Sequence, residues 1–337
     1  MLETLEEMDS FPSELEMWIR SKTHVATELA IAHAKENQDT RTVEEIVPKE
    51  LHDFLVVFSD KKAARFPKRK PYDHKIETKP GFKPKCHKLY SLTPEEDATL
   101  KTFIDKNLAK GYIRPSKSEM ASSFFFVKKK DNKKRPCQDY CYINEWTIKN
   151  SYPLPQISDL IDKLKGKRLF TKMDVRAGYN NVRIAKGHEW LAAFIMKYGL
   201  FEPLVMFFGL CNSPATFQHM MDNLFVHQLT DGWLLIYMDD MLVATDDDTA
   251  IHINCIRESL QILRDNDLFI KPSKCDFMVH KVEFLGFIIE NRTVSMDPIK
   301  VKGIVEWPAP QNLRQLRSFL GFCNFYHHFI YHYADLA

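Results

Sequence analysis

The chain has 337 residues, of which 45% are hydrophobic, so it can bury a sizeable core and is not a disordered chain. A formal net charge of +2 hides an uneven distribution: residues 1–60 carry 14 Asp/Glu and 5 Lys/Arg, whereas residues 61–88 carry 11 Lys/Arg and 2 Asp/Glu. The basic stretch indicates either a polyanionic partner or an ordinary solvated face. The seven cysteines lack metal-ligand spacing and no apolar run is long enough to span a membrane, so we expect an intracellular protein without a membrane anchor.

The N-terminal third contains two helix signals separated by a basic segment. Residues 13–34 are expected to form a helix that leads into a polar linker. Residues 66–85 combine four prolines with many lysines, which predicts an extended and exposed segment. Thr93 and Glu96 then form a capping-box pattern, and Gly111 marks the end of the helix that follows.

The next patterns alternate between strands and helices. A β-hairpin is predicted over residues 122–140, with a charged turn at Asp131–Asn132. The further elements are, in order, helix 155–166, strand 168–174, helix 212–229 capped by Ser213, hairpin 234–245, helix 248–266 and strands over 275–289. Helices mixed with strands that are joined by hairpins favour an α+β fold over a doubly wound sheet.

Two adjacent carboxylates stand at the centre of "LLIYMDDMLVAT", residues 234–245. A buried ionised carboxylate is costly unless it pairs or binds a metal, so we expect Asp239 and Asp240 at the tip of the hairpin. The apolar strand "LFTKMD" supplies a third carboxylate, Asp174, at its end. The three fit a site for two Mg²⁺ ions that catalyses phosphoryl transfer, although a bare Asp-Asp pair is more often a solvated turn.

The order of the motifs carries a resemblance to a known family. "YMDD" at 237–240 is the tetrapeptide associated with reverse transcriptases; it follows "RPCQDYCYINEW", "LFTKMDVRAGYNNVRI" and "VMFFGLCNSPATFQ", and it precedes "FIKPSKCDF" and "VEFLGFII". Over residues 47–337 the chain resembles the polymerase of gypsy-type LTR retrotransposons of the fungal type. The resemblance implies an α+β right-hand polymerase fold. It divides the chain into an acidic leader or linker over 1–62, reverse transcriptase fingers and palm over 63–287, and the truncated start of a thumb or connection over 288–337.

The resemblance also implies roles for single residues. The three carboxylates become metal ligands, with two Mg²⁺ ions as cofactors and Mn²⁺ as an alternative. The residues implied at the nucleotide are Lys129, Arg135, Tyr179, Phe208, Gly209 and Lys274. Those implied at the primer or template are Tyr237, Met238, Pro214, Phe284, Leu285 and Gly286. Tyr179 would exclude a ribose 2′-OH, but a packed Tyr179, a surface Lys274 and a simple bulge at Gly286 stay open as alternatives.

The implied activity is that of an RNA-directed DNA polymerase, which adds deoxynucleoside triphosphates to a primer 3′-OH on an RNA or DNA template. Its partners would be the template, the primer–product duplex and the protease, ribonuclease H and integrase of a retrotransposon polyprotein. The alternative is a weakened or inactive polymerase fold that only binds nucleic acid. Cys141 and Ile195, which replace residues that are usually basic in the family, favour this alternative. Tyr179 disfavours an RNA-directed RNA polymerase.

The C-terminal stretch "LRQLRSFLGFCNFYHHFIYHYADLA" is expected to form one amphipathic helix. Its apolar positions are Leu316, Phe319, Leu320, Phe322 and Phe325. Without packing partners such a helix would expose an aromatic patch.

Overall fold

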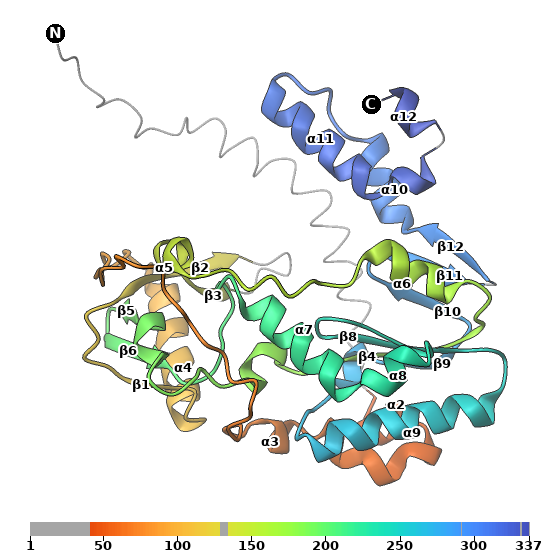
Figure 1. The fold of residues 1–337 in the computed structure, drawn as a ribbon, viewed down its shortest axis with the longest axis horizontal. Coiled ribbons are helices and arrows are strands. Elements are labelled where there is room, and N and C mark those ends of the chain that lie inside the picture. Colours follow the sequence, from red (N-terminus) through yellow and green to blue (C-terminus); the bar gives the residue numbers. More distant parts are fainter. Residues whose placement is uncertain (1–40, 129–133, 291, 331, 337) are drawn as a thin grey trace. The chain divides into compact units, whose positions relative to one another are not determined.

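The computed structural model describes residues 41–128, 134–290, 292–330 and 332–336 (Figure 1). Contacts divide the chain into two units, one formed by 1–40 with 126–135 and the other by 41–125 with 136–337. The second unit holds almost all the described residues, and the hairpin tip 126–135 is part of the first. The helix expected over 13–34, Lys129 and the turn Asp131–Asn132 lie outside the described residues. Among the described helices, none has the length and apolar character that crossing a bilayer requires.

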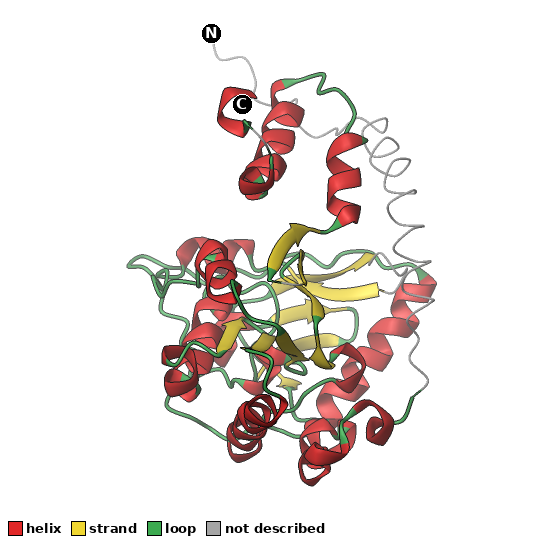
Figure 2. Ribbon diagram, turned by 90° about the vertical axis from the view of Figure 1, so that its right-hand side faces the viewer, coloured by secondary structure: helices red, strands yellow, loops and turns green. Residues whose placement is uncertain are grey.

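An antiparallel four-stranded sheet, the palm sheet, lies in the middle of the second unit, and helices flank it (Figure 2). Its strands follow the order β7-β8-β4-β9, with bounds β4 Leu169–Asp174, β7 Leu234–Tyr237, β8 Asp240–Thr245 and β9 Asp276–Val279. β4 and β8 are the central strands and are almost wholly buried, as their apolar sequences predict.

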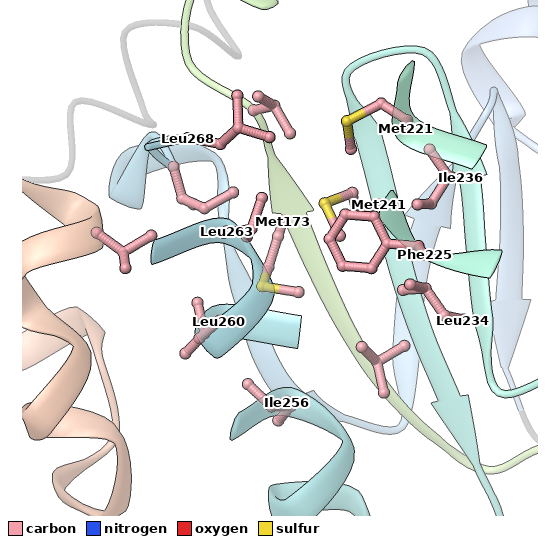
Figure 3. Close-up of a cluster of buried hydrophobic side chains, with 14 of the residues drawn as sticks. Met173, Met221, Phe225, Leu234, Ile236, Met241, Ile256, Leu260, Leu263 and Leu268 are labelled. Atoms are coloured by element: carbon pink, nitrogen blue, oxygen red, sulfur yellow. The ribbon is translucent and has the colours of Figure 1, made fainter. Parts of the chain in front are cut away.

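Helices cover one face of the palm sheet and enclose the main core (Figure 3). The covering elements are the α-helices α2 Val43–Ile46, α7 Ser213–Leu224, α8 Val226–Thr230 and α9 Thr249–Asp265 and the 3₁₀ helix η1 Lys49–Phe58. In Figure 3 the side chains of Met173 and Met241 lie near Leu260 and Leu263 of α9 and near Phe225, which joins α7 to α8. Alternation along the strands sends these residues to the helix side and leaves the neighbouring positions for the opposite face.

The palm core includes a segment that we expected to be a leader or linker. η1 buries Leu51, Phe54, Val57 and Phe58 in the same cluster as Met173. The described part of the palm layer therefore begins before residue 63. The reason is an amphipathic pattern inside an acidic stretch, in which the acidic residues stay on the solvent side and the apolar ones face the sheet. α3 Asp60–Ala63 follows, with Ser59 as its cap.

The opposite face of the palm sheet is covered by α6 Ile157–Leu164 and by a small three-stranded sheet. This sheet has the order β10-β11-β12, with bounds β10 Lys281–Phe284, β11 Phe287–Glu290 and β12 Thr293–Met296. The β10–β11 hairpin turns at Leu285 and Gly286, which both have positive φ, 53° and 83°. Positive φ at both central residues suits the right-handed twist of a two-residue hairpin.

A second, five-stranded sheet is built from the segments expected to form the fingers. Its order is β1-β6-β5-β2-β3, with bounds β1 Ile113–Pro115, β2 Ser122–Lys128, β3 Lys134–Gln138, β5 Phe194–Met196 and β6 Gly199–Pro203. The helices beside it are α4 Pro94–Ala109 and α5 Cys141–Trp146. The capping box predicted for α4 is confirmed, since Thr93 Oγ1 accepts from Glu96 N–H and the Glu96 carboxylate accepts from Thr93 N–H.

The expectation of one C-terminal helix is wrong. The predicted stretch instead forms α11 Leu313–Phe325, a 3₁₀ turn η5 His327–Phe329 and α12 Tyr333–Leu336, and α10 Pro298–Val305 precedes it. The Phe287 ring of β11 contacts Phe325, Tyr326 and Phe329, which lie on both sides of the break, with centroid distances of 6.0, 5.7 and 5.4 Å. Part of the predicted aromatic patch is therefore covered.

Candidate active site

The hairpin predicted around the two aspartates is present. β7 and β8 pair in a register that joins Tyr237 to Asp240 and leaves Met238 and Asp239 as a two-residue turn. Met238 has φ of 58°, in the left-handed region that few residues other than glycine adopt. Asp239 therefore lies at the tip of the hairpin, and Asp240 begins the central strand β8.

The third carboxylate reaches the same place through the sheet. Asp174 is the last residue of β4 and is the register partner of Asp240. Paired residues of an antiparallel ladder point to the same face, so these two carboxylates are neighbours. The next peptide is tied to the turn, since Val175 N–H donates to the Asp239 carbonyl at 2.8 Å. Three acids that are far apart in the sequence thus meet at one end of the palm sheet.

Burial and mutual charge make this end of the sheet unfavourable for negative charge. Asp174 is only 6% exposed. Desolvation raises the pKa of Asp239, and the charge of Asp174 adds to the effect. Desolvation likewise raises the pKa of Asp240, where the nearby Lys172 ammonium opposes the rise and both other aspartates add to it. A cation at this place would relieve the repulsion among the three carboxylates.

One cation of the chain itself is already there. Lys274 ends the 3₁₀ helix η4 Pro272–Lys274, and its Nζ lies 2.5 Å from Asp174 Oδ2. Lys271 N–H donates to the Asp174 carbonyl at 3.0 Å and fixes this loop to β4. Burial lowers the pKa of Lys274, but the hydrogen bond to Asp174 and the charges of the three aspartates outweigh it, so the pKa is raised overall. Lys274 is thus held as a charged partner of Asp174.

The donor set suits a hard divalent cation, although the side chains do not form a finished coordination shell. Within the described residues, no three His, Cys, Asp or Glu side chains are arranged so that they could hold a metal ion. Carboxylate oxygens are the ligands that Mg²⁺ prefers, and at Asp174 the Lys274 ammonium contacts one of the two, Oδ2. Three carboxylates meet here, and the pKa values of Asp239 and Asp240 are raised. Both the oxygen ligands and the negative charge therefore fit such an ion.

An aromatic wall stands beside the turn. Tyr179 belongs to the 3₁₀ helix η2 Gly178–Asn181, and its ring lies 4.9 Å from that of Phe208 and 5.8 Å from that of Phe217, measured between centroids. Desolvation raises the pKa of Tyr179 to about 12, with a further contribution from Asp239, so the phenol stays protonated next to the carboxylates. Phe208 remains 61% exposed, which leaves an aromatic surface open to solvent near Asp239.

Gly178 is a site residue that sequence reasoning missed. A Cβ on Gly178 would lie 3.1 Å from Phe217 Cζ and 3.5 Å from Asp239 Cβ. A side chain here would therefore press on the Phe217 ring and would touch Asp239 at an ordinary contact distance. The only signal in the sequence is a glycine four residues after Asp174, which does not reveal that the remote Phe217 approaches it.

The loop that carries Phe208 is fixed by α5. Asn144 Nδ2 donates to the Gly209 carbonyl at 2.7 Å, and Asn144 Oδ1 accepts from Cys211 N–H at 2.8 Å. Gly209 has φ of 103°, and a Cβ on it would lie 3.2 Å from the Tyr140 ring. Asn144 is a second residue that the sequence did not single out. α7 then begins at Ser213, which is its first residue and not its predicted cap, and Pro214 occupies the first turn as expected.

Comparisons with known proteins agree with this geometry. The family model described as "Reverse transcriptase (RNA-dependent DNA polymerase)" matches residues 127–289, which contain all three carboxylates. This segment belongs to the reverse transcriptase family.

The curated relatives of this reverse transcriptase segment are transposon polyproteins. The Tf2-3 and Tf2-4 transposon polyproteins of Schizosaccharomyces pombe are each 33% identical over 241 residues, which is 72% of this chain. The chain spans 18% of the length of each of these relatives. The resemblance to retrotransposon reverse transcriptases is therefore confirmed.

Solved reverse transcriptases share the fold. The foamy viral protease–reverse transcriptase in complex with an RNA/DNA hybrid has a TM-score of 0.70 and 22% identity, over 82% of this chain and 37% of that one. The same protein in complex with double-stranded DNA gives a TM-score of 0.71 and 22% identity, over 96% of this chain and 64% of that one. The predicted α+β right-hand fold is confirmed.

The remaining predicted residues of the reverse transcriptase segment are distributed around this site. Tyr237 and Met238 are half-buried in and beside the turn. Phe284 is fully buried, and the turn after it approaches the C-terminal helices, since a Cβ on Gly286 would lie 3.3 Å from Tyr326 Oη. Lys172 Nζ donates to the Glu283 carbonyl at 2.8 Å and fixes this hairpin to β4.

The two basic residues predicted at the nucleotide belong to the hairpin tip, which is part of the first unit. Lys129 lies outside the described residues. Arg135 is exposed on β3, in the tip that belongs to the first unit. Their roles stay predictions.

Proposed function

We propose that this chain is an RNA-directed DNA polymerase, which adds deoxynucleoside triphosphates to a primer 3′-OH. The observation that carries the proposal is the meeting of Asp174, Asp239 and Asp240 at the end of two central strands. Residues 127–289 belong to the reverse transcriptase family and the chain resembles transposon polyproteins, and both findings support the same reaction. The geometry supports a site in which catalysis depends on positioning and charge neutralisation.

Asp174, Asp239 and Asp240 would hold two Mg²⁺ ions, or Mn²⁺ in their place. Bound there, the ions supply the positive charge needed at the attacking 3′-oxygen and at the leaving pyrophosphate. Lys274, which pairs with Asp174 at 2.5 Å, is proposed to offset the negative charge of the departing pyrophosphate with its ammonium group.

The aromatic wall would shape the nucleotide pocket. The rings of Tyr179 and Phe208 stand together next to Asp239, so that the sugar of an incoming nucleotide lies against Tyr179. A 2′-OH would collide with this ring, which favours deoxynucleotides. Gly209 and Pro214 shape the loop behind Phe208, while Lys129 and Arg135 of the hairpin are proposed to contact the triphosphate.

The proposed partners are a template strand and a primer–product duplex. The related foamy viral enzyme was solved with an RNA/DNA hybrid and with double-stranded DNA. Tyr237, Met238 and the turn Leu285–Gly286 are proposed to contact the primer. Because the relatives are polyproteins, we further propose that the chain works with a protease, a ribonuclease H and an integrase. The seven free cysteines fit a reducing environment inside a cell.

Primer extension by the Asp239→Asn variant tests the proposal. The substitution removes a ligand charge and leaves the size of the side chain unchanged, so extension should fall by about 100-fold or more while primer–template binding stays within about threefold. Asp246→Asn is the matched control, because Asp246 is an exposed aspartate at the opposite end of β8. Wild-type rates for Asp239→Asn would exclude the proposed site.

A binding-only role remains the second candidate. Cys141 at the start of α5 and the half-buried Ile195 in β5 stand where the family usually has basic side chains. This role predicts that the wild-type chain binds primer–template but adds no nucleotide with Mg²⁺ or Mn²⁺. The same primer-extension assay, combined with a binding measurement, separates the two candidates.

A further inference from the structure

A line of hydrogen bonds runs from α7 to the backbone of the turn that carries Asp239. Gln218 is fully buried, and its Oε1 accepts from Met238 N–H at 2.8 Å. Its Nε2 donates to Asp222 Oδ1 at 2.8 Å and points toward the Ile236 carbonyl at 3.4 Å. One side chain thus holds the backbone on both sides of Tyr237.

The line continues outward to a tyrosine. Tyr152 Oη donates to Asp222 Oδ2 at 2.7 Å. Desolvation raises the pKa of Tyr152 to about 12, and its hydrogen bond to Asp222 contributes, so the phenol stays a donor at neutral pH. The Tyr152 ring also lies 4.6 Å from the His219 ring, which fixes its direction. Asp222 therefore accepts one hydrogen bond on each oxygen.

The hydrogen bonds of residue 218 require a side chain that both donates and accepts, as an amide does. The side chain must accept from a backbone N–H and donate to a carboxylate at the same time, which glutamine does and an ionised glutamate cannot. Met238 has φ of 58°, a conformation that is strained for a residue with a Cβ and persists only when its surroundings fix it. The next residue is Asp239, so a shift of the Met238 peptide moves that carboxylate directly.

We propose that Tyr152, Asp222 and Gln218 form a positioning relay that fixes the Asp239 carboxylate for nucleotide addition, with Gln218 as its central residue. The inference rests on the proposed polymerase function. It assigns these residues no contact with substrate. It predicts that breaking the relay lowers the rate of the chemical step more than the binding of either substrate, because only the geometry at the reacting atoms changes.

The test exchanges donor and acceptor within the relay. Gln218→Glu keeps the acceptor for Met238 N–H but places a second carboxylate against Asp222. We expect kcat for nucleotide addition to fall by about tenfold or more, with the Kd for primer–template and the KM for the nucleotide within about threefold of wild type. In Gln218→Glu/Asp222→Asn the new amide donates to the new carboxylate, so kcat should return to within about threefold of wild type.

The chain offers a matched control on the next helix. Gln228 in α8 is also buried, and its Nε2 donates to Glu258 Oε1 at 2.6 Å. Gln228→Glu therefore repeats the same change beside the same kind of partner, away from the turn. It should lower the Tm and leave kcat unchanged. The proposal is overturned if Gln218→Glu keeps the wild-type kcat, if the double variant does not recover, or if Gln228→Glu loses kcat equally.

Hydrogen exchange separates this inference from the proposed function. Exchange of the Met238 amide, followed by mass spectrometry of a peptide spanning 234–241, should speed up by about tenfold in Gln218→Glu and not in Gln228→Glu. An unchanged rate overturns the relay whatever the activity. A faster rate in a chain whose wild type adds no nucleotide instead overturns the polymerase function and leaves the relay as the support of the turn.

Discussion

At the scale of single residues, the carboxylates were predictable and their supports were not. Asp174, Asp239 and Asp240 stand out because an acid inside an apolar strand needs a reason. Gly178 and Gln218 do not stand out, since their importance comes from Phe217 and Met238, which only the folded chain brings near. A sequence pattern can reveal a charged residue whose burial costs free energy. It does not reveal a contact between segments that are far apart in the chain.

Tyr179 gives a prediction about substrate choice. Tyr179→Ala removes the ring next to Phe208 and Asp239, so the pocket should admit a 2′-OH. The ratio of kcat/KM for deoxynucleotides over ribonucleotides should fall by about tenfold or more. Tyr179→Phe keeps the ring and should keep the ratio near the wild-type value. An unchanged ratio in Tyr179→Ala would identify Tyr179 as a packing residue.

At the scale of elements, the basic segment shows how the fold presents its charges. His87 N–H donates to the Ala121 carbonyl at 2.8 Å, Ala121 N–H donates to the Lys85 carbonyl at 3.1 Å, and Ser123 Oγ donates to the Lys88 carbonyl at 2.6 Å. Residues 85–88 are thus fixed beside the start of β2. The segment 66–85 contains no helix or strand, as its prolines predicted, but it is not exposed throughout, since His74 and Ile76 are buried. In contrast, the two arginines earlier in this stretch form ion pairs within the fold, Arg65 with Asp267 and Arg69 with Asp73 and Glu189.

The lysines of this segment lead to a prediction about salt dependence. Lys83, Lys85 and Lys88 are exposed and would release counterions from a bound duplex. Replacing all three by alanine should make the slope of log affinity against log salt shallower by about one unit for each lysine that contacts a phosphate. Lys101→Ala/Lys106→Ala, which removes charge from α4, is the control. Equal slopes in wild type and the triple variant would show a solvated face without a role in binding.

Elements whose pattern is local were predicted well, and those decided by packing were not. The hairpin 234–245 was predicted from an apolar run with a polar centre, and the start of α4 from a capping box. Each of these signals lies within a few neighbouring residues. The C-terminal helix was predicted as one piece because its periodicity continues past the break. After Phe325 the chain leaves the helix and packs Tyr326 and Phe329 on the Phe287 ring of another element, a contact that the periodicity of the segment does not contain.

At the scale of the whole molecule, a buried histidine predicts how stability depends on pH. His252 is fully buried between Thr171 Oγ1 and Thr245 Oγ1, each 2.8 Å away, and desolvation lowers its pKa to about 4. The unfolded chain takes up a proton near pH 6.5, but the folded chain does not until near pH 4. Stability is therefore present above pH 6.5 and is lost as the pH falls toward 4.

Urea unfolding at two pH values checks this prediction. The His252 contribution should fall by about 2 kcal/mol between pH 7.5 and pH 5. His252→Gln, whose amide can bridge the same two hydroxyls without titrating, should lose less stability over this range than wild type does. The same pH dependence in both proteins would show that His252 is not the group responsible.

The packing of η1 against the palm sheet has a consequence for what can be cut out of this protein. The family match covers 127–289, yet Leu51, Phe54 and Val57 share a core with strands inside that range, and Ile270 N–H donates to the Val57 carbonyl at 2.9 Å. The stretch that carries the recognisable motifs is therefore smaller than the stretch that folds. A fragment trimmed to the motifs would keep α7, α8 and α9 but would expose the part of the core that η1 covers. An expression boundary, or a recombination junction between related elements, keeps this core covered if it lies before residue 47.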